Sequence, residues 1–172
     1  MKVTNATPAD AADLAALGEL TFAETFAHLY TAEDLAAYMA EAQTADWYTR
    51  AIADPDTGVW IIRDADGSAI GYGVAGRNTL PIEDHEPEAG EVKRLYLRQS
   101  AQGHGLGKRL LAHMLDWLDG RGYAPLYIGV YSDNPGAIRL YAAHGFSNVG
   151  EYHFMVGSHA DREFILKREA TS

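Results

Sequence analysis

Three glycines at alternate positions, in the stretch 102-QGHGLGKRL-110, come directly before a predicted helix. Each glycine inside a helix costs roughly 1 kcal/mol relative to alanine, so their placement needs a physical reason. Glycine lets the main chain approach a ligand closely, and the first turn of a helix offers unpaired N–H groups and a partial positive charge. We therefore predict a nest of main-chain amides that binds a pyrophosphate. Its amides belong to Gln102, Gly103, His104, Gly105, Leu106, Gly107 and Lys108.

Two other phosphate-binding motifs fit the sequence less well. The segment 71-GYGVAG-76 matches the spacing G-x-G-x-x-G of dinucleotide-binding loops, but that loop must open a helix, and here a proline-bearing acidic loop follows. Gly103 and Gly107 enclose three residues where a nucleoside triphosphate loop has four, and Arg109 replaces the hydroxyl that binds Mg²⁺. Lys108 and Arg109 either add positive charge to the nest or are solvated residues of the helix.

A second candidate group lies about thirty residues further along the chain. Asn134 precedes Pro135, a pair typical of a helix start, and Tyr141 follows two turns later on the face that it shares with Ala137. A tyrosine at helical spacing is usually a core residue, but its hydroxyl can also donate a hydrogen bond in a reaction. The residues alone leave both roles open.

The elements that must position these residues alternate between helix and strand. Capping residues predict helices after Thr7 and after Thr31, and a shorter helical piece follows at 46–53. The strand, helix and strand expected at 91–98, 105–119 and 126–131 form a βαβ unit, whose strands should be parallel. The remaining expected elements are a β-hairpin at 59–63 and 69–76, a mobile surface loop at 81–90, a short helix from 135 to about 144, and strands at 146–156 and 162–168.

Length, composition and charge limit the class of protein. The chain has 172 residues and is 47% hydrophobic, so we expect a single domain over residues 1–172 with one well-buried core. Its net charge of −10 would repel phosphate backbones and anionic headgroups, so we expect neither nucleic acid nor membrane partners. The chain begins without an apolar signal segment and contains no cysteine. We therefore expect a cytoplasmic protein with no disulfide and no metal.

Two signatures occur in this chain in the order and spacing of a known family. The strand 91-EVKRLYL-97 followed by 102-QGHGLG-107 is similar to Q/R-x-x-G-x-G/A, the acetyl-CoA signature of the GNAT superfamily of N-acetyltransferases. The run 134-NPGAIRLYAAHGF-146 resembles the second signature of that family. More narrowly, 21-TFAETF-26, 153-HFMVG-157 and 161-DREFILKR-168 are similar to bacterial spermine/spermidine acetyltransferases.

The resemblance implies a mixed α/β fold, in which about four helices flank a twisted mixed sheet of about seven strands. A bulge in the fourth strand would splay it from the fifth, so that 91–98 and 126–131 diverge. Acetyl-CoA, the implied cosubstrate, would lay its pantetheine arm in the gap and its pyrophosphate on the glycine nest, because an unpaired strand edge pairs with any extended amide. The further implied contacts are the main chain of Leu95, Tyr96 and Leu97 and the side chain of Asn134. Many members dimerise, so a homodimer is an implied assembly.

The implied reaction is direct attack of a primary amine on the thioester in a ternary complex, with no acyl-enzyme. An alkyl amine with a pKa of about 10.4 needs roughly 4.6 kcal/mol to lose its proton at pH 7, so a base must help. Our hypothesis gives this role to Glu91, through one water, with Glu24, His28 and His153 as fallback candidates. The family places the tyrosine that corresponds to Tyr141 near the sulfur, where it would donate a hydrogen bond to the departing thiol. Full proton transfer would be uphill by about 2 kcal/mol at ordinary pKa values of about 10 and 8.5.

The acceptor should lie against the first two predicted helices, whose candidate wall residues are Phe22, Phe26, His28 and Tyr30. The acidic loop carries Glu83, Asp84, Glu86 and Glu88. This loop either attracts a cationic acceptor, such as a polyamine, another small amine or a lysine-bearing peptide, or is simply solvated. A second function also stays open, namely a non-catalytic acyl-CoA-binding or sensing module.

Overall fold

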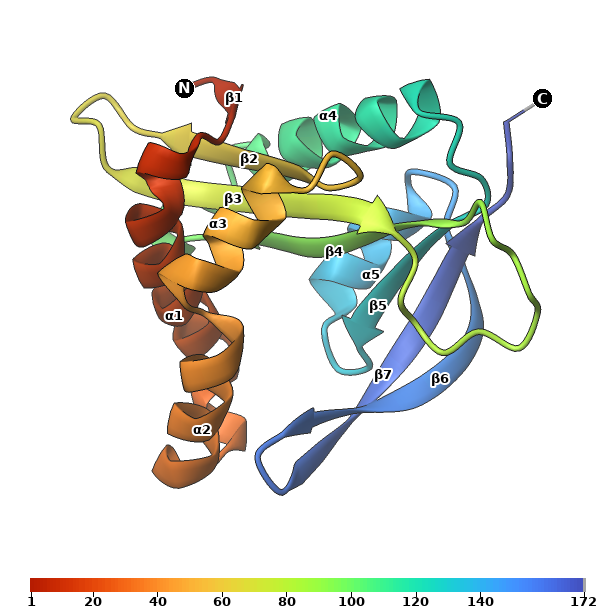
Figure 1. Cartoon of the computed structure of the whole chain (residues 1–172). Helices are drawn as coiled ribbons and strands as arrows, with labels where there is room; N and C mark the ends of the chain where they lie inside the picture. The colour runs from red at the N-terminus through yellow and green to blue at the C-terminus, as the bar shows by residue number, and fades with distance from the viewer. Residues whose placement is uncertain (172) are drawn as a thin grey trace.

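One mixed sheet of seven strands runs through the computed structural model, which describes residues 1–171, in the order β1-β2-β3-β4-β5-β7-β6 (Figure 1). The strands are β1 (Val3–Asn5), β2 (Gly58–Arg63), β3 (Ala69–Arg77), β4 (Gly90–Leu97), β5 (Leu126–Tyr131), β6 (Ser147–Val156) and β7 (His159–Arg168). The described α-helices are α1 (Ala11–Phe26), α2 (Ala32–Ala42), α3 (Ala45–Ala53), α4 (Leu106–Gly120) and α5 (Pro135–Ala142). β4 and β5 are parallel and every other neighbouring pair is antiparallel, which confirms the predicted mixed α/β class and the βαβ unit.

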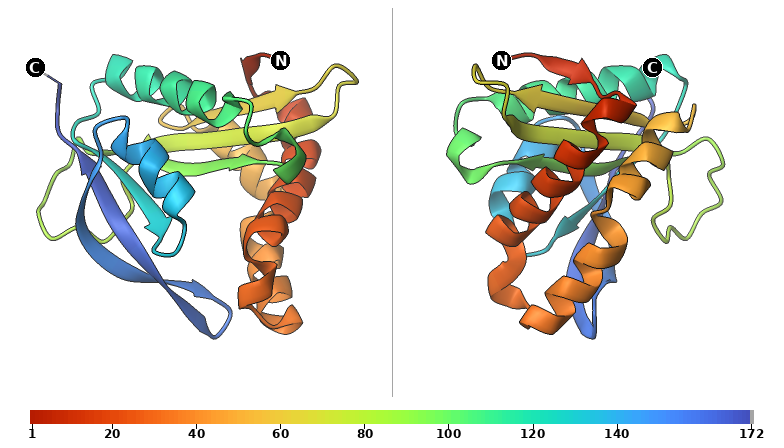
Figure 2. Two further views of the ribbon diagram at one scale, coloured as in Figure 1. Left: turned by 180° about the vertical axis from the view of Figure 1, so that it is seen from behind. Right: turned by 60° about the vertical axis from the view of Figure 1, so that its left-hand side comes forward.

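Helices cover both faces of the sheet (Figure 2). Successive side chains of β2 alternate between two apolar clusters, because a strand points its residues to opposite faces in turn. Trp60 and Ile62 pack in the cluster that contains α4, whereas Val59 and Ile61 pack in the cluster that contains α1 and α3. All four side chains are buried, and each contributes about 1.5–3 kcal/mol by removing apolar surface from water.

Side-chain caps set several helix starts close to where the sequence predicts them. The hydroxyl of Thr31 accepts a hydrogen bond from the Asp34 amide at 3.1 Å, and the side chain of Asn134 accepts one from the Ala137 amide at 3.3 Å. Thr7 caps a single 3₁₀ turn, Pro8–Asp10, that leads into α1. Strand β1 has no counterpart among the elements expected from the sequence, because three residues show too little alternation to signal a strand.

A β-bulge parts β4 from β5. The register between β3 and β4 pairs Val74 with Arg94 but Ala75 with Val92, so Lys93 is the extra residue. β4 pairs with β5 only from Gly90 to Val92. Beyond the bulge, β4 keeps its ladder to β3 and leaves its other edge without a strand partner among the described residues (Figure 1). The splay between the fourth and fifth strands is therefore confirmed.

The acidic segment between β3 and β4 contains no helix or strand, as expected, and it contacts the sheet at several points. Leu80 and Ile82 pack against the cluster of Tyr127 and Ile165, and Glu86 forms an ion pair with Lys167 at 3.0 Å. The segment 71–76 lies inside β3, so it opens no helix and cannot form a dinucleotide loop. Within residues 1–171, none of the helices has the length and apolar character of a bilayer span.

Candidate active site

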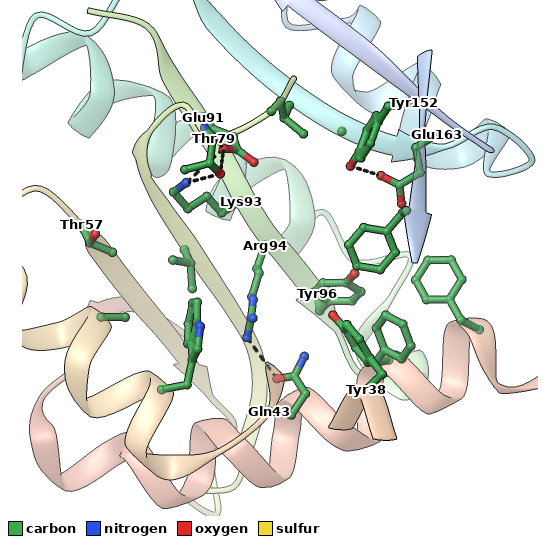
Figure 3. A pocket seen from close by; sticks show the side chains of 18 of the residues that line it. Tyr38, Gln43, Thr57, Thr79, Glu91, Lys93, Arg94, Tyr96, Tyr152 and Glu163 are labelled. Carbon is green, nitrogen blue, oxygen red and sulfur yellow. Dashed lines mark hydrogen bonds and ion pairs between the residues drawn. The ribbon is translucent and has the colours of Figure 1, made fainter. Parts of the chain in front are cut away.

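Two cavities meet where β4 and β5 part. The glycine-loop cavity, of about 510 Å³, lies between the end of β4, the loop before α4, and α5. The helix-side cavity, of about 670 Å³, lies between α1–α3, β4 and the β6–β7 hairpin (Figure 3). Four residues line both cavities: Phe26, Tyr96, Gly129 and Glu163. A molecule in one cavity can therefore reach a molecule in the other at the splay.

The structure brings most of the predicted cofactor residues to the glycine-loop cavity. The predicted residues that line it are Leu95, Tyr96, Leu97, Gln102, Gly103, Gly105, Gly107, Lys108, Asn134 and Tyr141. Two predicted residues are not part of this lining: His104 is exposed, and the side chain of Leu106 is buried in the core beside α4. Both entered the prediction through their main-chain amides, so their side chains need not face a ligand.

The backbone conformation explains two of the three glycines of the loop. Gly103 and Gly105 have φ angles of +80° and +76°, in the left-handed region that side chains rarely adopt, and Gly105 is the N-cap of α4. A Cβ atom at either position would meet no atom of the described chain within 4 Å, so an open cradle lies there. Gly107 is helical, and its Cβ atom would lie 3.5 Å from Leu97, an ordinary contact. The backbone conformation therefore demands glycine at two of the three positions.

Replacing Gly105 with alanine is expected to weaken coenzyme A binding about tenfold or more. The substitution places a side chain in a left-handed position, which costs roughly 1–2 kcal/mol, at the residue that leads the free amides of α4. Titration calorimetry with coenzyme A measures the change. Gly120→Ala at the other end of α4, where φ is ordinary and space is open, is the control and should bind like the wild type. Equal affinity in both variants would contradict the nest.

Tyr141 lies on α5 with 7% of its surface exposed and lines the glycine-loop cavity. Burial raises its pKa to about 12, and the charge of Glu163 adds to this shift. The hydroxyl is therefore a poorer acid than a free tyrosine, which favours a hydrogen-bond donor over a proton donor. On the same helix start, Asn134 uses its oxygen for the cap, so its NH₂ group is left for a ligand.

Glu91 lies in the helix-side cavity, where one of its oxygens is fully engaged. Oε2 accepts hydrogen bonds from the Thr79 amide at 2.8 Å, the Thr79 hydroxyl at 2.9 Å and the Lys93 ammonium at 3.0 Å (Figure 3). The residue is 6% exposed. Such a carboxylate holds the bulged Lys93 and the start of the 78–89 segment in place, which is a positioning role.

The fallback bases do not line either cavity, and the acidic residues of the loop do not line the helix-side cavity. Glu24 accepts a hydrogen bond from the Gln99 amide at 2.9 Å, and neither it nor His28 nor His153 lines a cavity at the splay. None of the four loop acids lines the helix-side cavity, and one of them, Glu86, is paired with Lys167. Of the predicted wall residues, those that do line it are Phe22, Phe26 and Tyr30.

Glu163, on β7, is a site residue that the sequence reasoning missed. It lines both cavities, and its Oε2 accepts a hydrogen bond from the Tyr152 hydroxyl at 2.6 Å (Figure 3). Burial raises its pKa above the ordinary value of 4.5, and the charges of Asp161 and Glu91 act in the same direction. A Cβ atom at Gly129 would lie 2.7 Å from the Tyr152 hydroxyl, so this strand glycine makes room for the pair. A glycine inside a strand is the one sequence signal that pointed here.

Comparison with known proteins identifies the family of this chain. The model of the acetyltransferase (GNAT) family matches residues 22–146, so the chain belongs to that family. It is 29% identical over 170 residues to the uncharacterised N-acetyltransferase of the pepI 3′ region of Lactobacillus delbrueckii subsp. lactis, a match that covers 98% of this chain and 96% of the relative.

Solved structures of that class share the fold. The PaiA N-acetyltransferase of Thermoplasma acidophilum, crystallised with coenzyme A, matches with a TM-score of 0.77 and 17% identity over 98% of both chains. The yncA protein of Salmonella typhimurium, solved with its cofactor acetyl-CoA, matches with a TM-score of 0.70 and 20% identity over 100% of this chain and 95% of its own. The expected GNAT fold is confirmed.

Proposed function

We propose that this protein transfers an acetyl group from acetyl-CoA to a primary amine that enters from the helix-side cavity. The observation that carries the proposal is the meeting of two cavities at Tyr96, Gly129 and Glu163, where β4 and β5 part. One cavity has the lining that a cofactor with a pyrophosphate and an amide-bearing arm requires. The other has an aromatic wall and buried carboxylates, which suit an amine.

The residues of the glycine-loop cavity fit coenzyme A in two respects. The free amides at the start of α4, next to the left-handed Gly103 and Gly105, suit a pyrophosphate. The edge of β4 at Leu95, Tyr96 and Leu97 has no strand partner on the side of β5, so its amides and carbonyls can pair with the pantetheine arm. Acetyl-CoA supplies the activated acetyl group as a thioester. Main-chain N–H groups at the splay stabilise the oxyanion that develops during attack.

Two side chains act on the reacting groups, one as a general base and one as a hydrogen-bond donor. The carboxylate of Glu163 takes the proton of the acceptor ammonium, because it lines both cavities and its raised pKa makes it a stronger base than an ordinary glutamate. Glu91, the base expected from the sequence, is the competing candidate, since it lines the same cavity with its Oε1 outside the Thr79 and Lys93 contacts. Tyr141 donates a hydrogen bond to the departing sulfur without giving up its proton.

Acetyl transfer is tested with purified protein, acetyl-CoA and a panel of small amines, polyamines and lysine peptides. Released thiol is measured with a chromogenic thiol reagent, which the protein itself cannot react with because it has no cysteine, and the product is identified by mass spectrometry. Amine-dependent thiol release with an acetylated product supports the proposal. Coenzyme A binding by calorimetry without any turnover would support the alternative, a non-catalytic acyl-CoA-binding module. Acetylation of polyamines in preference to other acceptors would bear out the resemblance to spermine/spermidine acetyltransferases.

A further inference from the structure

Arg94 lines the helix-side cavity, on the strand that carries Tyr96 two residues later. Its Nη1 donates to the carbonyl of Ala42 at 2.9 Å, to the hydroxyl of Tyr48 at 2.9 Å and to Oε1 of Gln43 at 3.3 Å. The guanidinium also lies over the ring of Trp47, 3.7 Å from its centroid. These contacts hold the cation in one orientation.

Every group that Arg94 contacts in this way is uncharged. Within residues 1–171, no carboxylate forms an ion pair with Arg94, whereas the neighbouring Lys93 is paired with Glu91. The Nε and Nη2 atoms of Arg94 make no hydrogen bond in this part of the chain, and they are not among its polar atoms sealed from solvent. This edge is therefore open to the cavity, where a carboxylate would add charge-assisted hydrogen bonds to the cation.

The cavity is therefore polarised. Glu163, whose only side-chain hydrogen bond in the described chain comes from the neutral Tyr152, lies where the two cavities meet. Arg94 and the exposed Arg50 line the part formed by β4 and α3. Asp54, at the end of α3, lines it too, but its carboxylate accepts hydrogen bonds from the Asp56 amide and the Thr57 hydroxyl. Among the described residues, Glu163 has no cation partner and Arg94 has no acid partner, both side chains are half-buried, and both line one cavity. A ligand with both charges would pair with each of them.

Resting on the acetyl transfer proposed above, we propose that the acceptor is an amine that also carries a carboxylate, which binds the Nε–Nη2 edge of Arg94 while the amine reaches Glu163. The free edge of a guanidinium presents two parallel N–H groups, the geometry that binds a carboxylate through both oxygens. Arg94 and Tyr96 are alternate residues of β4, so they point to the same face about 7 Å apart, and Tyr96 lines the junction of the two cavities together with Glu163. The two charged groups of the acceptor are therefore separated by several bonds. A polyamine is disfavoured, because its second ammonium would meet Arg94.

The test compares three series of acceptors with matched chain lengths on the wild-type protein. The ω-amino acids from 3-aminopropanoate to 6-aminohexanoate carry the carboxylate, the n-alkylamines lack it, and the α,ω-diamines replace it with a second ammonium. We expect kcat/KM for the best amino acid to exceed that of its alkylamine by about tenfold or more, since a hydrogen-bonded ion pair is worth that much. The diamines should be the poorest series.

Variants of Arg94 assign the preference to this residue. Arg94→Gln is expected to reduce the ratio of kcat/KM between the amino acid and the alkylamine by about 10- to 100-fold, chiefly through KM, and Arg94→Lys by less because a point charge lacks the fork. Arg121→Gln is the matched control. Arg121 also stacks over a tryptophan, 4.6 Å from the ring centroid of Trp117, and donates to a carbonyl, that of Pro55, at 2.7 Å, but it lines neither cavity of the site.

The outcomes separate this inference from the function on which it rests. Acetylation of all three series with equal kcat/KM, or with diamines preferred, overturns the proposal that the acceptor carries a carboxylate. The proposed acetyl transfer is unaffected by that result. No acetylation of any amine, with coenzyme A still bound, overturns both. A preference that persists in Arg94→Gln overturns the assignment to Arg94. Calorimetric affinity for coenzyme A shows whether Arg94→Gln is folded. If it is not folded, the comparison of the three acceptor series on the wild-type protein still decides the substrate class.

Discussion

Glu163→Gln is expected to lower kcat/KM for the amine by about 10²- to 10⁴-fold, the range that a positioned general base contributes. The wild-type profile of kcat/KM against pH should fall on its acidic side as Glu163 takes up a proton, at a pH above 4.5 because burial raises its pKa. Glutamine cannot take the proton, so the variant should lose this acidic limb. The measurement is the full profile with a saturating concentration of acetyl-CoA.

Glu91→Gln is the matched comparison, because Glu91 lines the same cavity. This variant should keep the acidic limb, since Glu91 is assigned to hold Lys93 and Thr79. If the limb disappears in Glu91→Gln and stays in Glu163→Gln, the base is Glu91, as first expected from the sequence.

Stability distinguishes a catalytic from a structural role of Glu163. Its folded-state pKa is raised, so its contribution to the free energy of unfolding is fully present below the unfolded-state pKa and is lost as pH rises through the folded-state pKa. Above the folded-state pKa of Glu163, the variant removes a half-buried charge while its amide oxygen can still accept from Tyr152. Its melting temperature should therefore equal or exceed that of the wild type. A loss of activity that tracked a lower melting temperature would indicate a structural role.

Tyr141→Phe is expected to lower kcat by about 10²-fold, comparable to the removal of one hydrogen-bond donor from developing negative charge. With a pKa of about 12 for Tyr141 against about 8.5 for a thiol, full proton transfer is uphill by about 5 kcal/mol. We therefore expect the hydroxyl to stabilise the leaving thiolate as a donor. The affinity for coenzyme A should change much less than kcat.

The pH profile tests this role of Tyr141 directly. If the hydroxyl only donates a hydrogen bond, the basic limb of kcat should be the same in the wild type and in Tyr141→Phe up to about pH 10. Tyr127→Phe removes another buried hydroxyl, which bonds to Glu86 outside both cavities, and should leave kcat close to the wild-type value. A basic limb that vanished only in Tyr141→Phe would show that this tyrosine transfers its proton.

The features that depend on residues close together in the chain could be predicted from the sequence. Capping residues such as Thr31 and Asn134 and the glycine spacing before α4 act through neighbours a few residues away. The two signatures then identified the family, which its sequence model confirms over residues 22–146. Gly103 and Gly105 are left-handed, so the backbone conformation itself requires glycine there, and the approach of a ligand stays a prediction.

The tertiary structure alone decided which charged side chains share the cavity. Glu91 and Glu163 are both strand carboxylates in the sequence, but the bulge turns Lys93 onto the first, while pairing of β5, β6 and β7 brings the second beside Tyr152 and the splay. Likewise, the sequence shows Arg94 only as one of two adjacent basic residues. Its uncharged partners come from α2 and α3 in the folded structure. Burial and pairing set the chemistry of a charge, and both arise from residues far apart in the chain, so no local pattern encodes them.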